Sequence, residues 1–182
     1  MSVIEKQAAT ITAGAWQSDP IHSSLGFEVK YLGAARFRGE LSEFDGVLNV
    51  ADDGISLVGA GRVASVRTKD ENLDAHLRSP EFFDAENHPE VAFSGQVRPA
   101  DGGVEADGEI TIKGVTQPVE LTGRATEPLI DAYGRERFGL TLETKLDRTA
   151  FGLSWNLPLP SGEPALSNEV TLAAELFFVK EA

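Results

Sequence analysis

The chain has 182 residues, of which 41% are hydrophobic and 25% are charged, and its formal net charge is -13. This length suits one domain with a substantial core, and this composition leaves little room for a long disordered region. The negative charge repels phosphate backbones and anionic membrane surfaces, so we expect no nucleic-acid partner and favour a neutral or apolar ligand. The absence of cysteine excludes disulfides and thiolate chemistry.

The start of the sequence resembles neither a leader nor a membrane anchor. Residues 1–13 contain an acidic residue and lack an apolar run long enough for a signal-peptide core. No later stretch reaches the length of a membrane-spanning helix. We therefore expect a cytoplasmic protein without a membrane span, with an N-terminal extension at residues 1–13 and a single domain at residues 14–182.

Alternation of apolar and polar residues predicts the first strands. The clearest one covers residues 24–30, and its apolar face is made by Leu25, Phe27 and Val29. Between residues 37 and 50 the apolar side chains switch parity, which predicts a strand bent by a bulge near Ser42. Residues 55–66 are apolar on both parities, which predicts a strand covered on both faces, with a helix as the outer cover.

One acidic segment breaks the strand pattern. Leu73 and Leu77 are four residues apart and acidic side chains come early, so we predict a short helix over residues 70–78. Ser79 followed by Pro80 is typical of a second helix start, with the serine as the cap. We therefore expect one or two short helices in this segment.

Four later segments return to the period of two. Their apolar faces contain Phe93 and Val97, then Leu121, then Leu140 and Leu142, and finally Leu172 and Leu176. Turns rich in aspartate and glycine separate them, so we predict an antiparallel meander in which each strand has one apolar face. Near the end, prolines interrupt an apolar run around Trp155, which predicts a loop.

Strands with one apolar face must bury those faces together, either in a two-sheet sandwich or in a closed barrel. Small residues such as Gly95, Gly123 and Ala174 share the apolar faces with bulky ones. The mixture either fits large neighbours into a filled core or leaves an elongated void, because a barrel of about eight strands is at the size limit for holding one ligand. Parity leaves both alternatives open, and an apolar void favours a hydrocarbon chain over water.

A series of short motifs runs along the chain. They are Asp19-Pro20-Ile21-His22-Ser23-Ser24-Leu25-Gly26-Phe27; Ala64-Ser65-Val66 with Thr68; Asp74-Ala75-His76-Leu77 with Ser79, Phe82-Phe83-Asp84 and Pro89; Gly108-Glu109-Ile110-Thr111-Ile112-Lys113-Gly114-Val115-Thr116 with Pro118; and Arg148 with Phe151-Gly152-Leu153. In this order they resemble the YceI-like polyisoprenoid-binding family nearly from end to end. The resemblance implies an all-β, extended, lipocalin-like antiparallel barrel of about eight strands. It also implies a long isoprenoid or similar lipid in the pore, and a homodimer.

The resemblance brings no established catalytic set, so we expect no enzyme, no catalytic residue and no cofactor apart from a bound lipid. Strand parity assigns the pore lining to Leu25, Phe27, Val29, Phe93, Val97, Leu121, Leu140, Leu142, Leu172 and Leu176. The pore mouth is assigned to Arg148, Phe151 and Trp155. Arg148 could hold a carbonyl or phosphate there, although a surface salt bridge is the favoured alternative. The loop around Trp155 is a lid, a dimer contact or simple packing.

Other chemistries have weak signals in the sequence. His22, His76 and His88 match no ligand spacing, so we expect no metal site and assign them capping or structural hydrogen bonds. Residues 59–64 match the dinucleotide fingerprint, but the sequence after them continues as a strand. The serine nucleophile elbow of hydrolases does not occur.

These observations favour a lipid carrier or reservoir. We expect it to bind a long-chain isoprenoid or related lipid, such as a quinone with its side chain, for storage, protection or transport. Two alternatives stay open at this point: a lipid-modifying hydrolase that uses a polar residue at the pore mouth, and a stress-related interaction protein with a filled barrel.

Overall fold

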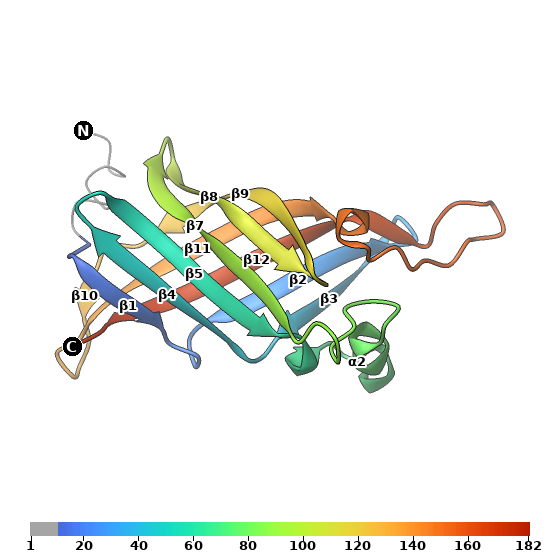
Figure 1. Cartoon of the computed structure of the whole chain (residues 1–182), viewed down its shortest axis with the longest axis horizontal. Coiled ribbons are helices and arrows are strands. Elements are labelled where there is room, and N and C mark those ends of the chain that lie inside the picture. The colour runs from blue at the N-terminus through green and yellow to red at the C-terminus, as the bar shows by residue number, and fades with distance from the viewer. Residues whose placement is uncertain (1–10) are drawn as a thin grey trace.

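A computed structural model describes residues 11–182, and antiparallel strands make up most of this part of the chain (Figure 1). The strands are β1 (Gly14–Ser18), β2 (Ser24–Tyr31), β3 (Ala35–Leu41), β4 (Phe44–Ala51), β5 (Gly54–Arg62), β6 (Val66–Arg67), β7 (Glu90–Ala100), β8 (Gly103–Ile112), β9 (Val115–Ala125), β10 (Leu129–Ile130), β11 (Glu136–Asp147) and β12 (Leu166–Lys180). The helical elements of residues 11–182 are α2 (Glu71–Arg78) and two 3₁₀ turns, η1 (Val63–Ser65) and η2 (Arg148–Phe151).

The strands close into an eight-stranded antiparallel barrel. Around the barrel the hydrogen-bonded order is β11, β9, β8, β7, β5, β4, β1 and β12, and β12 pairs back onto β11. This last ladder joins residues 137–147 to residues 169–179. Closure removes the strand edges along the ring, and it confirms the all-β, lipocalin-like barrel that the sequence predicts.

At two neighbouring positions of the barrel, two successive strands replace one continuous strand. β1 and β2 both pair with β12, and the chain leaves the sheet between them. β4 and β3 lie beside them, and the strand is interrupted between Leu41 and Phe44. Glu43 N donates to Ser65 Oγ at 3.0 Å, so η1 holds the interruption in place. The break confirms the bend predicted near Ser42, but it is an interruption between two strands and not a bulge within one strand.

Residues 55–66 do not form the predicted strand covered on both faces. β5 ends at Arg62 and its outer face is open, since Val58 is 56% exposed. The later apolar residues Val63 and Val66 belong to η1 and β6 and are buried. The mixed parity therefore comes from two consecutive elements, and the prediction of one doubly covered strand is wrong.

The acidic segment forms α2, as the spacing of its leucines predicts. Asp70 caps the helix, because its Oδ1 accepts hydrogen bonds from Asn72 N at 2.7 Å and Leu73 N at 3.3 Å. Ser79 starts no second helix: its Oγ donates to His76 O at 2.6 Å, so it closes α2 instead. Of the one or two short helices expected here, one forms, and turns follow it.

The barrel interior divides into two halves along its long axis. The half near the C-terminus, called the filled end from here on, is packed by Trp16, Leu48, Phe138 and Phe178 among others. The half near α2, called the hollow end, is bordered by a second cluster that includes Val29, Leu77, Phe82 and Phe151. Figure 1 shows α2 and the loop between η2 and β12 at the hollow end, opposite the C-terminus.

Part of the expected N-terminal extension packs on the filled end. Residues 1–10 lie outside the described residues. Ile11 is buried among the side chains of the filled end, and Thr12 O accepts a hydrogen bond from Trp16 Nε1 at 3.1 Å. The division into residues 1–13 and 14–182 stays a prediction. Within residues 11–182, no helix has the length and apolar character that crossing a membrane requires.

Candidate ligand-binding cavity

The hollow end contains a cavity of about 180 Å³. Inward side chains of the barrel strands form its walls, and Leu77 of α2 closes one side together with Phe82 and Phe83 of the turn after it. The charged residues that border it are Asp45 and Arg148, and the rest of the lining is almost entirely apolar. Water finds few hydrogen-bond partners in such a space, so the cavity favours a hydrocarbon ligand.

Most of the side chains predicted to line a pore border this cavity. They are Leu25, Phe27, Val29, Phe93, Leu121, Leu142, Leu172 and Leu176. Val97 and Leu140 also point inward, but they are buried in the filled end and do not border the cavity. Parity predicts which face a residue occupies and not its depth along the barrel axis, which is why these two assignments need correction.

Glycines hold the rings of two phenylalanines against the wall. Gly39 lies across the ladder from Phe27, and a Cβ at Gly39 would overlap the Phe27 ring. Gly95 lies two residues after Phe93, and a Cβ there would come within 2.8 Å of Phe93 Cζ. Each ring therefore covers a residue without a side chain, which leaves more of the lumen free.

Three aromatic rings pack the lumen at the filled end. The ring centres of Trp16 and Phe138 are 5.1 Å apart in an edge-to-face arrangement, and Phe138 stacks on Phe178 at 5.5 Å. All three side chains are fully buried, and none of them borders the cavity. The cavity is therefore confined to the hollow end and does not reach these rings.

η2 and the loop after it form one side of the cavity, and Leu153 of this loop is buried and lines it. Phe151 is buried and borders the cavity. Trp155, also predicted at the mouth, does not border it: its ring centre lies 4.6 Å from that of His76 and 5.3 Å from that of Phe82. These contacts join the loop to α2 and to the turn after it.

Arg148 borders the cavity, and its side chain is buried rather than paired on the surface. The residue is 6% exposed. Its Nε donates to Ser167 O at 2.9 Å, and its Nη1 donates to Leu153 O at 2.7 Å and Trp155 O at 2.8 Å. Burial lowers the pKa of the guanidinium below its ordinary value. The favoured alternative of a surface salt bridge is wrong, and Arg148 instead fixes the path of the loop.

Two of the histidines hydrogen-bond to carboxylates. His22 Nδ1 lies 2.8 Å from Asp19 Oδ2, and His76 Nε2 lies 2.6 Å from Glu81 Oε2. In the part of the chain that the structure describes, no three carboxylate, imidazole or thiol groups gather as a metal site requires. His22 and His76 therefore have structural partners.

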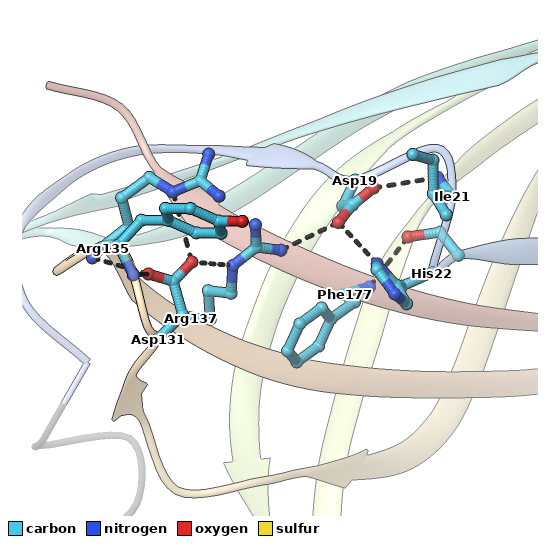
Figure 2. Close-up of polar contacts among 9 residues, drawn as sticks. Asp19, Ile21, His22, Asp131, Arg135, Arg137 and Phe177 are labelled. Carbon is cyan, nitrogen blue, oxygen red and sulfur yellow. Dashed lines mark hydrogen bonds and ion pairs between the residues drawn. The ribbon is translucent and has the colours of Figure 1, made fainter.

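Sequence reasoning missed a cluster of ion pairs on the outer wall of the filled end. Figure 2 shows Arg137 between Asp19 and Asp131: its Nη1 lies 2.8 Å from Asp19 Oδ2, and its Nε lies 2.7 Å from Asp131 Oδ2. The three side chains are only 11–14% exposed. The hydrogen bond with His22, and then that with Arg137, holds the pKa of Asp19 well below its usual range.

This cluster pins the point where the chain leaves the sheet between β1 and β2. Asp19 also accepts a hydrogen bond from Ile21 N at 2.9 Å, and Ser23 Oγ accepts one from Phe177 N at 2.9 Å. The motif at residues 19–27 was the available signal for these residues. It could not pair Asp19 with Arg137, because the two are 118 residues apart in the chain.

A second hollow, on the outer face of β2, β3, β11 and β12, is polar. Some of its charges are paired across the strands, since Glu28 lies 3.1 Å from Arg36 and 2.6 Å from Arg38. The hydrogen bond with Arg38 lowers the pKa of Glu28 most. Paired charges in an open hollow do not favour a lipid tail, so the candidate site is the inner cavity.

Comparison with known proteins decides the family. A family model described as the YceI-like domain matches residues 16–178. The chain belongs to the YceI-like family. A UPF0312 protein of Staphylococcus aureus (strain USA300) is 28% identical to this YceI-like chain over 167 residues, which cover 88% of the chain and 94% of that protein. The resemblance read from the motifs is confirmed.

Two solved structures share the fold of this YceI-like chain. BcnA of Burkholderia cenocepacia superposes with a TM-score of 0.71 at 19% identity, covering 88% of the chain and 98% of that structure. A polyisoprenoid binding domain from Saccharophagus degradans superposes with a TM-score of 0.64 at 12% identity, covering 91% and 98%. At such identities the likeness shows the barrel and not a common ligand.

Proposed function

We propose that this YceI-like protein binds a long-chain isoprenoid or a related lipid, with the apolar chain in the hollow end and the head group at the mouth. The observation that carries the proposal is the apolar cavity of about 180 Å³ inside the barrel. The polyisoprenoid binding domain of Saccharophagus degradans, which has the same fold, supports the choice of ligand class. Such a protein would store, protect or transport the lipid.

The hydrophobic effect supplies the driving force in this proposal. Removing apolar surface from water yields about 25 cal/mol per Å², and an apolar cavity of about 150 Å³ is known to stay dry and to take a benzene molecule. The cavity described here has that size, so it holds a short stretch of chain. A longer chain needs more room, which the loop around Trp155 supplies by moving away from His76 and Phe82.

A binding role explains the lining better than a catalytic one. The cavity is almost entirely apolar, and its charged neighbours are Asp45 and Arg148, which include no nucleophile with an adjacent base. His76, the histidine near the mouth, is engaged with Glu81. We therefore propose a binding protein. A homodimer and a cytoplasmic location stay predictions from the sequence, for sedimentation and cell fractionation to test.

A pair of neighbouring substitutions on β12 tests the proposal. Leu172 points into the cavity, whereas Thr171 points outward between Lys145 of β11 and Glu28 of β2. Leu172→Glu should weaken the binding of retinol, a fluorescent isoprenoid alcohol, at least tenfold, because it places a polar carboxylate in the apolar wall that contacts the ligand. Thr171→Glu adds the same charge outside and should leave the affinity within about twofold.

Lipid extraction provides the second measurement. Mass spectrometry of organic extracts from the purified wild type should find a long-chain lipid, and extracts of Leu172→Glu should contain much less. Repeated empty extracts, together with no uptake of retinol or of a polyprenyl quinone by the wild type, contradict the proposal. Equal uptake by the wild type and a well-folded Leu172→Glu protein places the ligand elsewhere.

A further inference from the structure

Arg148 is a buried cation whose partners are all neutral. Its three hydrogen bonds go to the carbonyl oxygens of Ser167, Leu153 and Trp155. None of the ion pairs found within residues 11–182 includes it. A buried charge without a counter-charge is costly, because the low-dielectric surroundings replace water poorly.

One nitrogen of the same side chain has no partner at all. Nη2 of Arg148 is buried and makes no hydrogen bond within the described part of the chain. An unsatisfied buried donor costs about 1–3 kcal/mol, and more when the group is charged. Because Arg148 borders the cavity, a ligand bound there is the partner that we consider for this nitrogen.

The other charged neighbour of the cavity differs in this respect. Asp45 Oδ2 lies 3.2 Å from Arg62 Nη2, and both side chains are partly exposed, so that carboxylate already has a counter-charge. The carboxylate next to Arg148 in sequence, Asp147, is also engaged: it caps η2 by accepting from Thr149 N at 2.9 Å. Arg148 is therefore the charged neighbour of the cavity that forms no ion pair within the described residues, and Asp147 offsets only part of the cost of burying its charge.

We propose that Arg148 binds the head group of the cavity ligand through Nη2 and selects a long-chain amphiphile with an anionic oxygen head group, a carboxylate or a phosphate, over a neutral one. This inference rests on the proposed function and adds the class of head group to it. A neutral alcohol or carbonyl can accept the hydrogen bond of Nη2 but leaves the buried charge uncompensated. An anionic oxygen does both, in a charge-assisted hydrogen bond.

The net charge of -13 does not oppose this preference. Surface charges act through water, where salt screens them beyond about 8 Å at physiological ionic strength, whereas a pair inside the barrel is screened much less. Burial lowers the pKa of Arg148, and the neighbouring Asp147 carboxylate offsets this effect only in part. An anionic oxygen beside Nη2 would offset the free-energy cost of burying the guanidinium charge.

The position of Arg148 also orients the ligand. The residue opens η2 at the hollow end, and the buried rings of Trp16, Phe138 and Phe178 pack the other end of the barrel. A head group held at Arg148 leaves the tail to extend toward the filled end. The ligand therefore has one orientation in this proposal, with its head group at Arg148 and its tail toward the filled end.

A head-group series on one isoprenoid tail tests the proposal with the wild-type protein. Farnesol, farnesoic acid and farnesyl phosphate are compared by displacement of retinol, followed by its fluorescence at pH 7. We expect at least one of the two anions to bind at least tenfold tighter than farnesol, and the anion with the higher affinity identifies a carboxylate or a phosphate site. Equal affinities for all three overturn the inference and leave the proposed function intact. Failure of retinol and of all three to bind overturns both.

Variants then assign the preference to Arg148. Arg148→Met should reduce the ratio of anion to farnesol affinity at least fivefold, and Arg148→Lys should retain part of it. Lys145→Met removes an exposed cation of the outer face and should leave the ratio unchanged. The ratio, unlike the absolute affinity, is insensitive to a general loosening of the loop. An unchanged ratio in Arg148→Met overturns the assignment, and if that variant does not fold, the wild-type series alone decides.

Discussion

The two ends of the barrel belong to one closed sheet but are filled differently. At the filled end, inward aromatic side chains of β1, β11 and β12 contact one another across the lumen, as Trp16, Phe138 and Phe178 do. At the hollow end, the inward rings of Phe27 and Phe93 lie over Gly39 and Gly95. The comparison teaches that glycines opposite large side chains, and not a shortage of large side chains, keep the lumen open.

The filled end contributes mainly to the stability of the barrel, and the hollow end provides the space for a ligand. Dense packing at the filled end stabilises the barrel, because each buried ring gains many dispersion contacts. The hollow end forgoes some of that packing and keeps a dry space. If the comparison is right, equal substitutions at the two ends should have unequal effects.

Truncating one phenylalanine at each end gives the largest expected effect. Phe138→Ala should lower the free energy of unfolding by about 3–5 kcal/mol, because it leaves a hole in a close-packed region. Phe93→Ala should cost about 1–2 kcal/mol, because Phe93 already borders a cavity. Urea unfolding of both variants and the wild type measures the difference, and equal losses would mean that the two ends are packed alike.

Removing Arg137 from the ion-pair cluster on the outer wall of the filled end should give the next largest loss of stability. Arg137→Met should cost about 2–3 kcal/mol at pH 7, because Asp19 and Asp131 lose charge-assisted hydrogen bonds from a shared partner. Arg135→Met is the matched control: it also contacts Asp131, at 3.2 Å, but is half exposed, so it should cost less than about 1 kcal/mol.

The same cluster should make the stability of the folded protein depend on pH. The pKa values of Asp19 and Asp131 are lowered in the folded protein, chiefly by the hydrogen bonds from His22 and from Arg135 N, respectively. A lowered carboxyl pKa stabilises the folded state above the ordinary value of about 4, and this contribution is lost as the pH falls further. The stability gap between wild type and Arg137→Met should therefore shrink between about pH 5 and pH 2. A gap that stays constant over this range would contradict the assignment.

The smallest expected effect concerns the volume of the hollow end. Gly39→Ala should push the Phe27 ring into the lumen and weaken retinol binding about tenfold, or about 1.4 kcal/mol. Gly26→Ala is the control, because a Cβ there meets only Gly39 O at 3.4 Å. Retinol affinities from fluorescence titration test the pair. Full affinity in Gly39→Ala would show that the ring position does not limit the cavity.

Much of the fold could be predicted from short-range patterns. The strand at residues 24–30, the bend near Ser42 and the helix over about residues 70–78 follow from local spacing, and the structure confirms them. Residues 55–66 could not be predicted in this way, because their mixed parity arises where β5 gives way to η1 and β6. When one strand ends and another element begins within an apolar run, the pattern of apolar and polar residues does not show where the boundary lies.

The candidate site could be predicted only in part, for a related reason. Parity put Leu121 and Leu172 on the inner face, but it put Val97 and Leu140 there as well, and depth along the axis separates the two pairs. Depth depends on the register of every ladder around the barrel. The burial of Arg148 depends on the loop that folds back over it, which no periodicity describes.

The sequence by itself determined that this chain forms single-faced strands and that it resembles the YceI-like family, because alternation and motif order are properties of neighbouring residues. The tertiary structure decided which inward side chains meet and which leave a cavity. It also decided that Arg148 is buried with an unpaired nitrogen and that Asp19 pairs with Arg137. These outcomes required closure of the ring, which brings together residues far apart in the chain.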